Sequence, residues 1–141
     1  MGMNNKIHVT TQGQGLYEFT AQVNEIVSQS KAKSGICQLF LQHTSAGLII
    51  QENADPSAKR DLETWLARLV KENDPLYTHV FEGADDMPSH IKAVLTGNAL
   101  TIPIIDGKLA LGTWQGIYLW EFRDGAQRRN VIVTVMGGVS V

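Results

Sequence analysis

Hydrophobic residues alternate with polar ones over several short stretches, and this period of two predicts β-strands. The clearest stretch is 36–43, where Cys37, Leu39 and Leu41 fall on one face of the predicted strand. His43 continues that apolar face at the end of the strand, just before a polar turn. Similar patterns predict further strands over residues 6–11, 16–20, 48–52, 99–105, 108–112, 118–123 and 130–136.

Other stretches carry apolar residues at the spacing of a helix face. The first spans residues 20–30, with Val23, Ile26 and Val27 on one side and Thr20 as its expected N-cap. This face predicts a helix that packs on the core.

Asp55 and Pro56 mark the start of a second helix, which we expect to run to Lys71. A carboxylate at the N-cap accepts hydrogen bonds from the first free amides, and proline loses nothing at the first helical position. The buried stripe of this helix is predicted to consist of Ala58, Leu62, Trp65, Leu66 and Leu69.

A third, short helix is predicted over residues 88–97. Because the residue before a proline avoids the α region, we expect Met87 to cap this helix. Asp85 and Asp86 then lie just outside its positive end, with His90 in the first turn.

The pairs Asp106-Gly107 and Asp124-Gly125 stand between predicted strands, which is typical of antiparallel hairpins. The pattern as a whole predicts an α+β fold, a largely antiparallel β-sheet with two or three helices. We interpret residues 1–141 as a single domain, and we expect residues 1–5, which show no pattern, to fray.

The composition limits the classes of partner. The 141 residues carry 43% hydrophobic and 18% charged residues, with a formal net charge of −2. Lys and Arg are scattered, so the chain lacks the basic footprint of a nucleic-acid-binding protein. No apolar run approaches the roughly 20 residues that a membrane span needs. We therefore expect neither a nucleic-acid partner nor a membrane partner.

Cysteine usage bears on the compartment. The single cysteine, Cys37, cannot form an internal disulfide, and the N-terminus shows no signal pattern. These features favour the cytoplasm. Cys37 lies in the middle of an apolar strand face, so we interpret it as a core residue rather than a nucleophile.

Three of the four histidines have polar company at the ends of predicted elements. His43, His79 and His90, with Asp86, offer the nitrogen and oxygen ligands that zinc or another divalent ion prefers. The same groups could instead form an acid and base pair, or simply cap helices. Two adjacent carboxylates, Asp85 and Asp86, repel each other, and a nearby cation would offset that repulsion.

The strongest strand also carries polar residues where packing would favour Val or Ile. Glu121 and Arg123 either pair with each other or serve a substrate, since Arg can clamp a phosphate by two parallel hydrogen bonds. Trp114 is either a core residue or the wall of a pocket. Asn53 either lines the same pocket as His43 or caps the next helix.

Several stretches together resemble the YjbQ-like family. They are His43-Thr44-Ser45-Ala46, Glu52-Asn53-Ala54-Asp55-Pro56, Glu82-Gly83 through His90-Ile91-Lys92, and Gly112-Thr113-Trp114-Gln115-Gly116-Ile117 through Arg123. The resemblance implies an α+β domain that forms trimers, with polar pockets near subunit contacts that hold a metal ion or an oxyanion. It also implies a secondary thiamine-phosphate synthase activity, which couples hydroxymethylpyrimidine diphosphate to thiazole phosphate and releases pyrophosphate.

The resemblance and the residues together suggest these roles. The catalytic candidates are Asp85, Asp86, His90 and Glu121. The candidates for binding a small phosphorylated substrate are Thr44, Asn53, Trp114, Gln115 and Arg123. The candidate ligands for a divalent metal ion, zinc or magnesium, are His43, His79, His90 and Asp86. The alternative is a non-catalytic module that binds a metal ion or a small anion, and for either function we expect a homotrimer.

Overall fold

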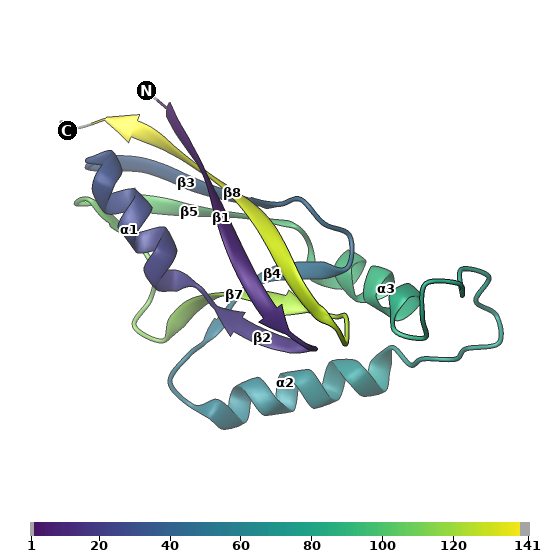
Figure 1. Ribbon diagram of the computed structural model, residues 1–141. Helices are drawn as coiled ribbons and strands as arrows, with labels where there is room; N and C mark the ends of the chain where they lie inside the picture. Colours follow the sequence, from purple (N-terminus) through teal and green to yellow (C-terminus); the bar gives the residue numbers. More distant parts are fainter. Residues whose placement is uncertain (1, 139–141) are drawn as a thin grey trace.

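The computed structural model describes residues 2–138, which form two antiparallel sheets and three helices (Figure 1). The five-stranded sheet has the order β1 (Gly2–Gln12), β8 (Ala126–Gly138), β3 (Ser34–Leu41), β5 (Ala99–Ile105) and β6 (Lys108–Leu109). The three-stranded sheet has the order β2 (Gly15–Glu18), β7 (Gln115–Glu121) and β4 (Ala46–Glu52). The helices are α1 (Thr20–Ser30), α2 (Pro56–Leu69) and α3 (Asp86–Thr96).

Two hydrophobic clusters hold these layers together, and β7 contributes to both. Ile117 and Leu119 face the main core, which includes α1 and the buried face of the five-stranded sheet. Trp120 and Phe122 face the other way and pack with Leu66 of α2. Because successive side chains of a strand point to opposite faces, one buried strand joins both clusters.

The alternation predicted for β3 is confirmed. Cys37, Leu39 and Leu41 are buried in the main core. Burial raises the pKa of the Cys37 thiol to about 11, so the thiol stays protonated at neutral pH. This environment agrees with a packing role for Cys37.

The predicted helix starts are partly confirmed. The α2 helix begins at Pro56, and the Asp55 carboxylate accepts a hydrogen bond from Ser57 N at 2.9 Å. The α1 helix has the predicted bounds, but Phe19 occupies its N-cap position. The Thr20 hydroxyl instead accepts a hydrogen bond from the backbone amide of Ile117, which ties the helix start to β7.

Two other predictions are wrong in detail. Residues 2–5 do not fray, because they pair with residues 133–136 of β8, while Met1 lies outside the described residues. Trp65 and Leu69 of α2 are 53% and 56% exposed, because the helix packs on the three-stranded sheet mainly through Leu66. The Asp106-Gly107 hairpin does form as predicted, with φ angles of 52° and 79°.

The α3 helix starts at Asp86, two residues before the predicted start. Pro88 is its third residue, where a backbone N–H would have no partner within the helix, so proline costs no hydrogen bond there. The earlier start places Asp86 and His90 four residues apart on one helix face.

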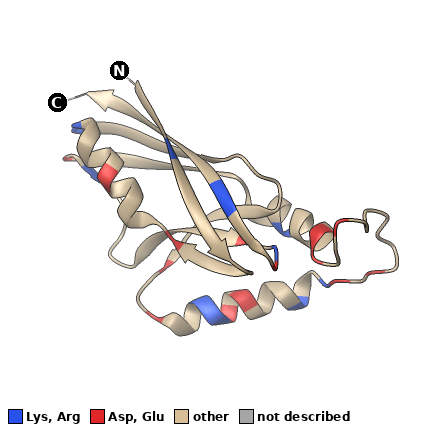
Figure 2. Cartoon of the chain, viewed as in Figure 1, with Lys and Arg blue, Asp and Glu red and all other residues tan. Residues whose placement is uncertain are grey.

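The α2 helix carries residues of both signs, as Figure 2 shows, with a basic pair followed by two acidic residues and one basic residue near its end. Among residues 2–138, no helix is long and apolar enough to cross a membrane. The α+β prediction, with antiparallel sheets and three helices, is confirmed.

Candidate metal centre

Two imidazoles and one carboxylate meet at the start of α3. The Nε2 atoms of His79 and His90 lie 2.6 Å and 3.1 Å from Oδ2 of Asp86. One ligand atom from each of the three residues lies within 4.8 Å of the other two. The structure therefore brings together three of the four predicted metal ligands.

The loop before α3 carries His79 to the helix face. Leu76 N donates to the Asp74 carboxylate at 2.9 Å, and Tyr77 N donates to the Asp74 carbonyl at 3.0 Å, which fixes the loop just before the histidine. The His79 and His90 rings lie 5.5 Å apart between centroids. Glu82, which the sequence analysis did not assign, also approaches His79 Nε2, at 2.9 Å. Glu82 lies three residues after His79, and this short spacing is the sequence feature that could have predicted the contact.

Arg123 holds the two adjacent carboxylates. Its Nε donates to Asp85 at 2.9 Å, Nη1 donates to Oδ1 of Asp86, and Nη2 donates to the Glu82 carbonyl at 2.9 Å. The backbone amide of Asp124 adds a hydrogen bond to Asp85 at 2.9 Å. The hydrogen bond with Asp85 raises the pKa of the Arg123 guanidinium. One guanidinium thus offsets the repulsion between Asp85 and Asp86.

Both carboxylates are held in the ionised form. Burial favours the neutral acid of Asp86, but hydrogen bonds from His79 and the charge of Arg123 outweigh it and lower the pKa of Asp86. The pKa of Asp85 is also lowered, because the Asp124 amide and Arg123 outweigh the effect of burial. Asp86 therefore presents Oδ1 to Arg123 and a charged Oδ2 to the two histidines.

A backbone carbonyl fixes the ring of His90. Nδ1 of His90 lies 2.8 Å from the carbonyl oxygen of Thr44, and a carbonyl can only accept a hydrogen bond. We therefore assign the proton of a neutral His90 ring to Nδ1, which leaves a lone pair on Nε2. That lone pair faces the ionised oxygen of Asp86, and two acceptors at 3.1 Å require a proton or a cation between them. Metal-ligating histidines commonly show this arrangement.

With this geometry established, sequence comparison identifies the family. The family model described as "UPF0047 protein YjbQ-like" matches residues 5–138. The chain belongs to the YjbQ-like family. It is 49% identical to a UPF0047 protein of Synechocystis over 131 residues, covering 93% of this chain and 89% of the relative. It is 39% identical to YjbQ of Escherichia coli O157:H7, covering 92% of this chain and 94% of the relative.

Solved structures show the same fold. A YjbQ/UPF0047 protein from Clostridium acetobutylicum is 38% identical with a TM-score of 0.82, covering 95% of this chain and 99% of that one. A conserved hypothetical protein from Thermus thermophilus is 36% identical with a TM-score of 0.84, covering 94% and 99%. The match to the YjbQ-like family and its fold is confirmed.

His43, the fourth predicted metal ligand, does not lie in the cluster of His79, Asp86 and His90. Its Nε2 accepts a hydrogen bond from the backbone amide of Asn130 at 2.9 Å. Its Nδ1 lies 3.4 Å from the Arg129 guanidinium. Burial and the charge of Arg129 lower the pKa of His43. Both ring nitrogens are engaged away from Asp86.

Glu121, which was predicted to be catalytic, lies in a buried ion pair rather than in the cluster of His79, Asp86 and His90. It is fully buried, pairs with Arg129 and accepts a hydrogen bond from the Thr11 hydroxyl at 2.7 Å. Its side chain does not pair with the Arg123 guanidinium, although it accepts from the Arg123 backbone amide at 3.0 Å. The sequence analysis did not predict a role for Arg129. Arg129 lies an even number of residues before the buried valines of β8, so it points to the same face of the strand.

The remaining predicted substrate residues lie at the other end of β7. Gln115 pairs with Glu52 there, and Trp114 accepts a hydrogen bond from Asn53 N through its carbonyl at 2.9 Å. The seven residues from Gln115 to Glu121, which are six steps along the strand, span roughly 20 Å at the usual rise of a strand. Within one chain, Asn53, Trp114 and Gln115 therefore share no pocket with the metal centre. Thr44 does reach the centre, through its carbonyl oxygen.

Proposed function

We propose that this YjbQ-like protein is an enzyme that binds a divalent metal ion through His79, Asp86 and His90 and acts on a small phosphorylated molecule. The specific reaction that we propose is thiamine-phosphate synthase-like, coupling hydroxymethylpyrimidine diphosphate to thiazole phosphate with release of pyrophosphate. The observation that carries the proposal is the convergence of two imidazole nitrogens on an ionised carboxylate oxygen.

The ligand set favours zinc over magnesium. Magnesium prefers oxygen ligands and keeps several waters, whereas imidazole nitrogen suits zinc and its transition-metal neighbours. Two nitrogens and one oxygen leave room for a further ligand on a four-coordinate ion, as in catalytic zinc sites. When bound, such an ion would supply a Lewis acid that neutralises charge on a phosphate oxygen.

The residues around the ligands would position them. Arg123 fixes the orientation of Asp86 through Oδ1, and the Thr44 carbonyl fixes the ring of His90. The donor nitrogens of Arg123 are engaged by Asp85, Asp86 and the Glu82 carbonyl. These contacts support a positioning role for Arg123 in place of the phosphate clamp that the sequence suggested.

One observation favours the alternative, a non-catalytic module that binds a metal ion or small anion. The cavity beside His79 has a volume of about 150 Å³ and is lined partly by Tyr77 and Gly83. Small-molecule sites commonly occupy about 300–1,000 Å³. A reaction between two organic phosphates would therefore need additional walls.

We propose that a neighbouring subunit of a homotrimer supplies those walls. Leu76 and Phe81, on the loop that carries His79, are 87% and 97% exposed, and Val94 on α3 is 84% exposed. Large apolar side chains gathered near one site are typical of an interaction surface. Light scattering over a dilution series is expected to give a trimer mass at micromolar concentration. A monomer mass there would exclude the trimer. The cytoplasmic location stays a prediction.

Elemental analysis and a turnover assay together test the function. Protein purified without chelators is expected to contain about one zinc-class ion per chain, and His90→Ala protein to contain much less. Product should form from the two thiamine precursors with wild-type protein and be lost with Asp86→Asn and His90→Ala.

The two measurements separate the two functions. Bound metal without product would leave the binding module. Product from both variants in the amount that wild type gives would contradict the role of Asp86 and His90 in the reaction. Absence of metal, with no stabilisation by added zinc, would contradict the metal centre itself, because a ligand of the native state must stabilise it.

A further inference from the structure

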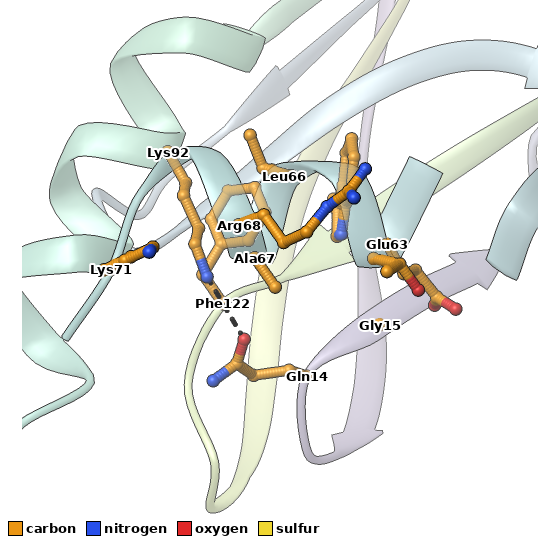
Figure 3. A pocket seen from close by; sticks show the side chains of 11 residues that line it. Gln14, Gly15, Glu63, Leu66, Ala67, Arg68, Lys71, Lys92 and Phe122 are labelled. Carbon is orange, nitrogen blue, oxygen red and sulfur yellow. Dashed lines mark hydrogen bonds between the residues drawn. The ribbon is translucent and has the colours of Figure 1, made fainter. Parts of the chain in front are cut away.

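A second pocket lies between α2 and the outer face of the three-stranded sheet (Figure 3). Its volume of about 500 Å³ is in the range of small-molecule sites. Trp120 and Phe122 of the sheet side and Leu66 of α2 supply apolar lining. Lys92, two residues after His90 in the sequence motif, enters from α3.

The ammonium group of Lys92 is the unusual feature of this pocket. The residue is 6% exposed, and in Figure 3 its side chain points toward Gln14. Nζ donates to Oε1 of Gln14 at 3.3 Å and lies 5.8 Å from the centre of the Phe122 ring. Gln14 is oriented for this contact, because its amide nitrogen donates to the Asp124 carboxylate at 2.7 Å.

No carboxylate pairs with Lys92 among residues 2–138. An ammonium group offers three donors, and Gln14 takes one of them. The carboxylates of Glu72, Asp124 and Asp85 act on the ammonium group through their charge, without an ion pair. A buried, uncompensated charge is costly, so its retention suggests a ligand.

The charges around the pocket have an excess of positive sign. Arg68 and Lys71 line it from the end of α2, where cations also complement the helix dipole. The helix dipole explains those two cations but not the buried Lys92 on a different helix. The carboxylate in the lining, Glu63, already accepts a hydrogen bond from Leu16 N at 2.8 Å.

We propose that this pocket binds a small organic anion, with its carboxylate or phosphate group on Lys92 and its apolar body against Trp120 and Phe122. The anion replaces water as the partner of the two remaining donors of the ammonium group. The site is separate from the metal centre, because residues two apart on a helix, such as His90 and Lys92, face different sides. The proposal therefore goes beyond the metal-dependent function and does not rest on it.

Calorimetric titration of metal-free full-length protein tests this site with benzoate and phenyl phosphate as probes. Benzyl alcohol is the neutral counterpart, and inorganic phosphate is the counterpart without an apolar body. We expect at least one organic anion to bind about tenfold or more tightly than both counterparts, because a charge-assisted hydrogen bond and an apolar contact act together.

Variants locate the binding. Lys92→Met is expected to weaken the organic anion about tenfold or more, while Lys92→Arg retains binding. Arg60→Gln removes one exposed positive charge from the same α2 helix, outside the pocket lining, and is expected to change affinity less than about twofold. Thermal melting checks that each variant is folded. Lys92→Met should melt no lower than wild type, because it removes an uncompensated buried charge.

Three results would overturn the proposal. It fails if neither organic anion binds up to about 10 mM, if folded Lys92→Met binds as tightly as wild type, or if benzyl alcohol or inorganic phosphate binds as tightly as the organic anions. His79→Gln is expected to abolish the metal centre and leave anion binding unchanged. The two proposals can therefore fail separately.

Discussion

Two clusters that each pair arginine with a carboxylate lie near the same end of β7, and they differ in how completely their polar atoms are satisfied. In the buried cluster, Glu121 receives hydrogen bonds from Arg129 and Thr11, and both residues of the ion pair are almost inaccessible. In the candidate metal centre, Arg123 satisfies one oxygen of Asp86, while the other oxygen faces imidazole nitrogens that solvent can reach.

The comparison shows that residue type does not by itself identify a functional site. Glu121 and Asp86 are both buried acids paired with arginine, and the sequence suggested catalysis for both. The difference lies in the remaining partners. Glu121 has donors on both oxygens, whereas Asp86 directs one oxygen toward groups that can also bind a cation.

The largest expected effect comes from breaking the ion pair of the buried cluster. Arg129→Met leaves the Glu121 carboxylate buried without its cation, and removal of one member of a buried ion pair costs about 3–5 kcal/mol. Denaturant unfolding at neutral pH measures this loss in the free energy of unfolding. Arg128→Met is the matched control, because Arg128 is exposed on the same strand and should change stability by less than about 0.5 kcal/mol. Equal losses in both variants would contradict the role of the ion pair.

The local parts of the fold could be predicted from the sequence. The bounds of α1 and the buried face of β3 follow from the spacing of apolar residues, and the start of α2 follows from its cap; both signals depend on residues close in sequence. The start of α3 differs from the prediction because proline is tolerated in a first helical turn, so Asp86 and Met87 are helical ahead of Pro88. Tertiary contacts outweighed the local preference.

The grouping of the site residues could not be predicted in the same way. The partners of His43 are Arg129 and Asn130, which lie more than eighty positions away in sequence. His90 lies four residues after Asp86 on one helix face, but no local pattern indicates that His79 rather than His43 will also meet Asp86. The phase of Arg129 with the valines of β8 does predict its burial, but it does not predict the ion pair with Glu121.

A smaller effect is expected from Arg123→Gln, and its dependence on pH sharpens the comparison. Arg123 lowers the pKa values of Asp85 and Asp86, so it stabilises the fold where these groups are ionised. The variant should lose about 2 kcal/mol at neutral pH, the magnitude of hydrogen bonds to charged groups. Because the folded-state pKa values are lowered, this contribution is complete above the unfolded value, near 3.8, and disappears as pH falls through the folded values.

Urea unfolding of wild type and Arg123→Gln between pH 3 and 7 measures that dependence. The difference between the two proteins should be constant down to about pH 5 and should narrow below about pH 4. Arg123→Lys keeps the charge but lacks the fork that reaches both carboxylates, so it should recover only part of the stability. A difference that widened at acid pH would contradict the assigned electrostatics.

The smallest expected change in the free energy of unfolding comes from removing one imidazole of the candidate metal centre when no metal is bound. His79 lies on a loop, its side chain is about half exposed, and Asp86 keeps Arg123 as a partner when the imidazole is removed. In the presence of a chelator, His79→Gln should therefore change the free energy of unfolding by no more than about 0.5 kcal/mol. Added zinc should then stabilise wild type but not the variant, since only the complete ligand set gives differential binding to the native state. A large loss in the free energy of unfolding without metal would show that His79 is a structural residue like Arg129. The distinction between the buried cluster and the candidate metal centre would then not hold.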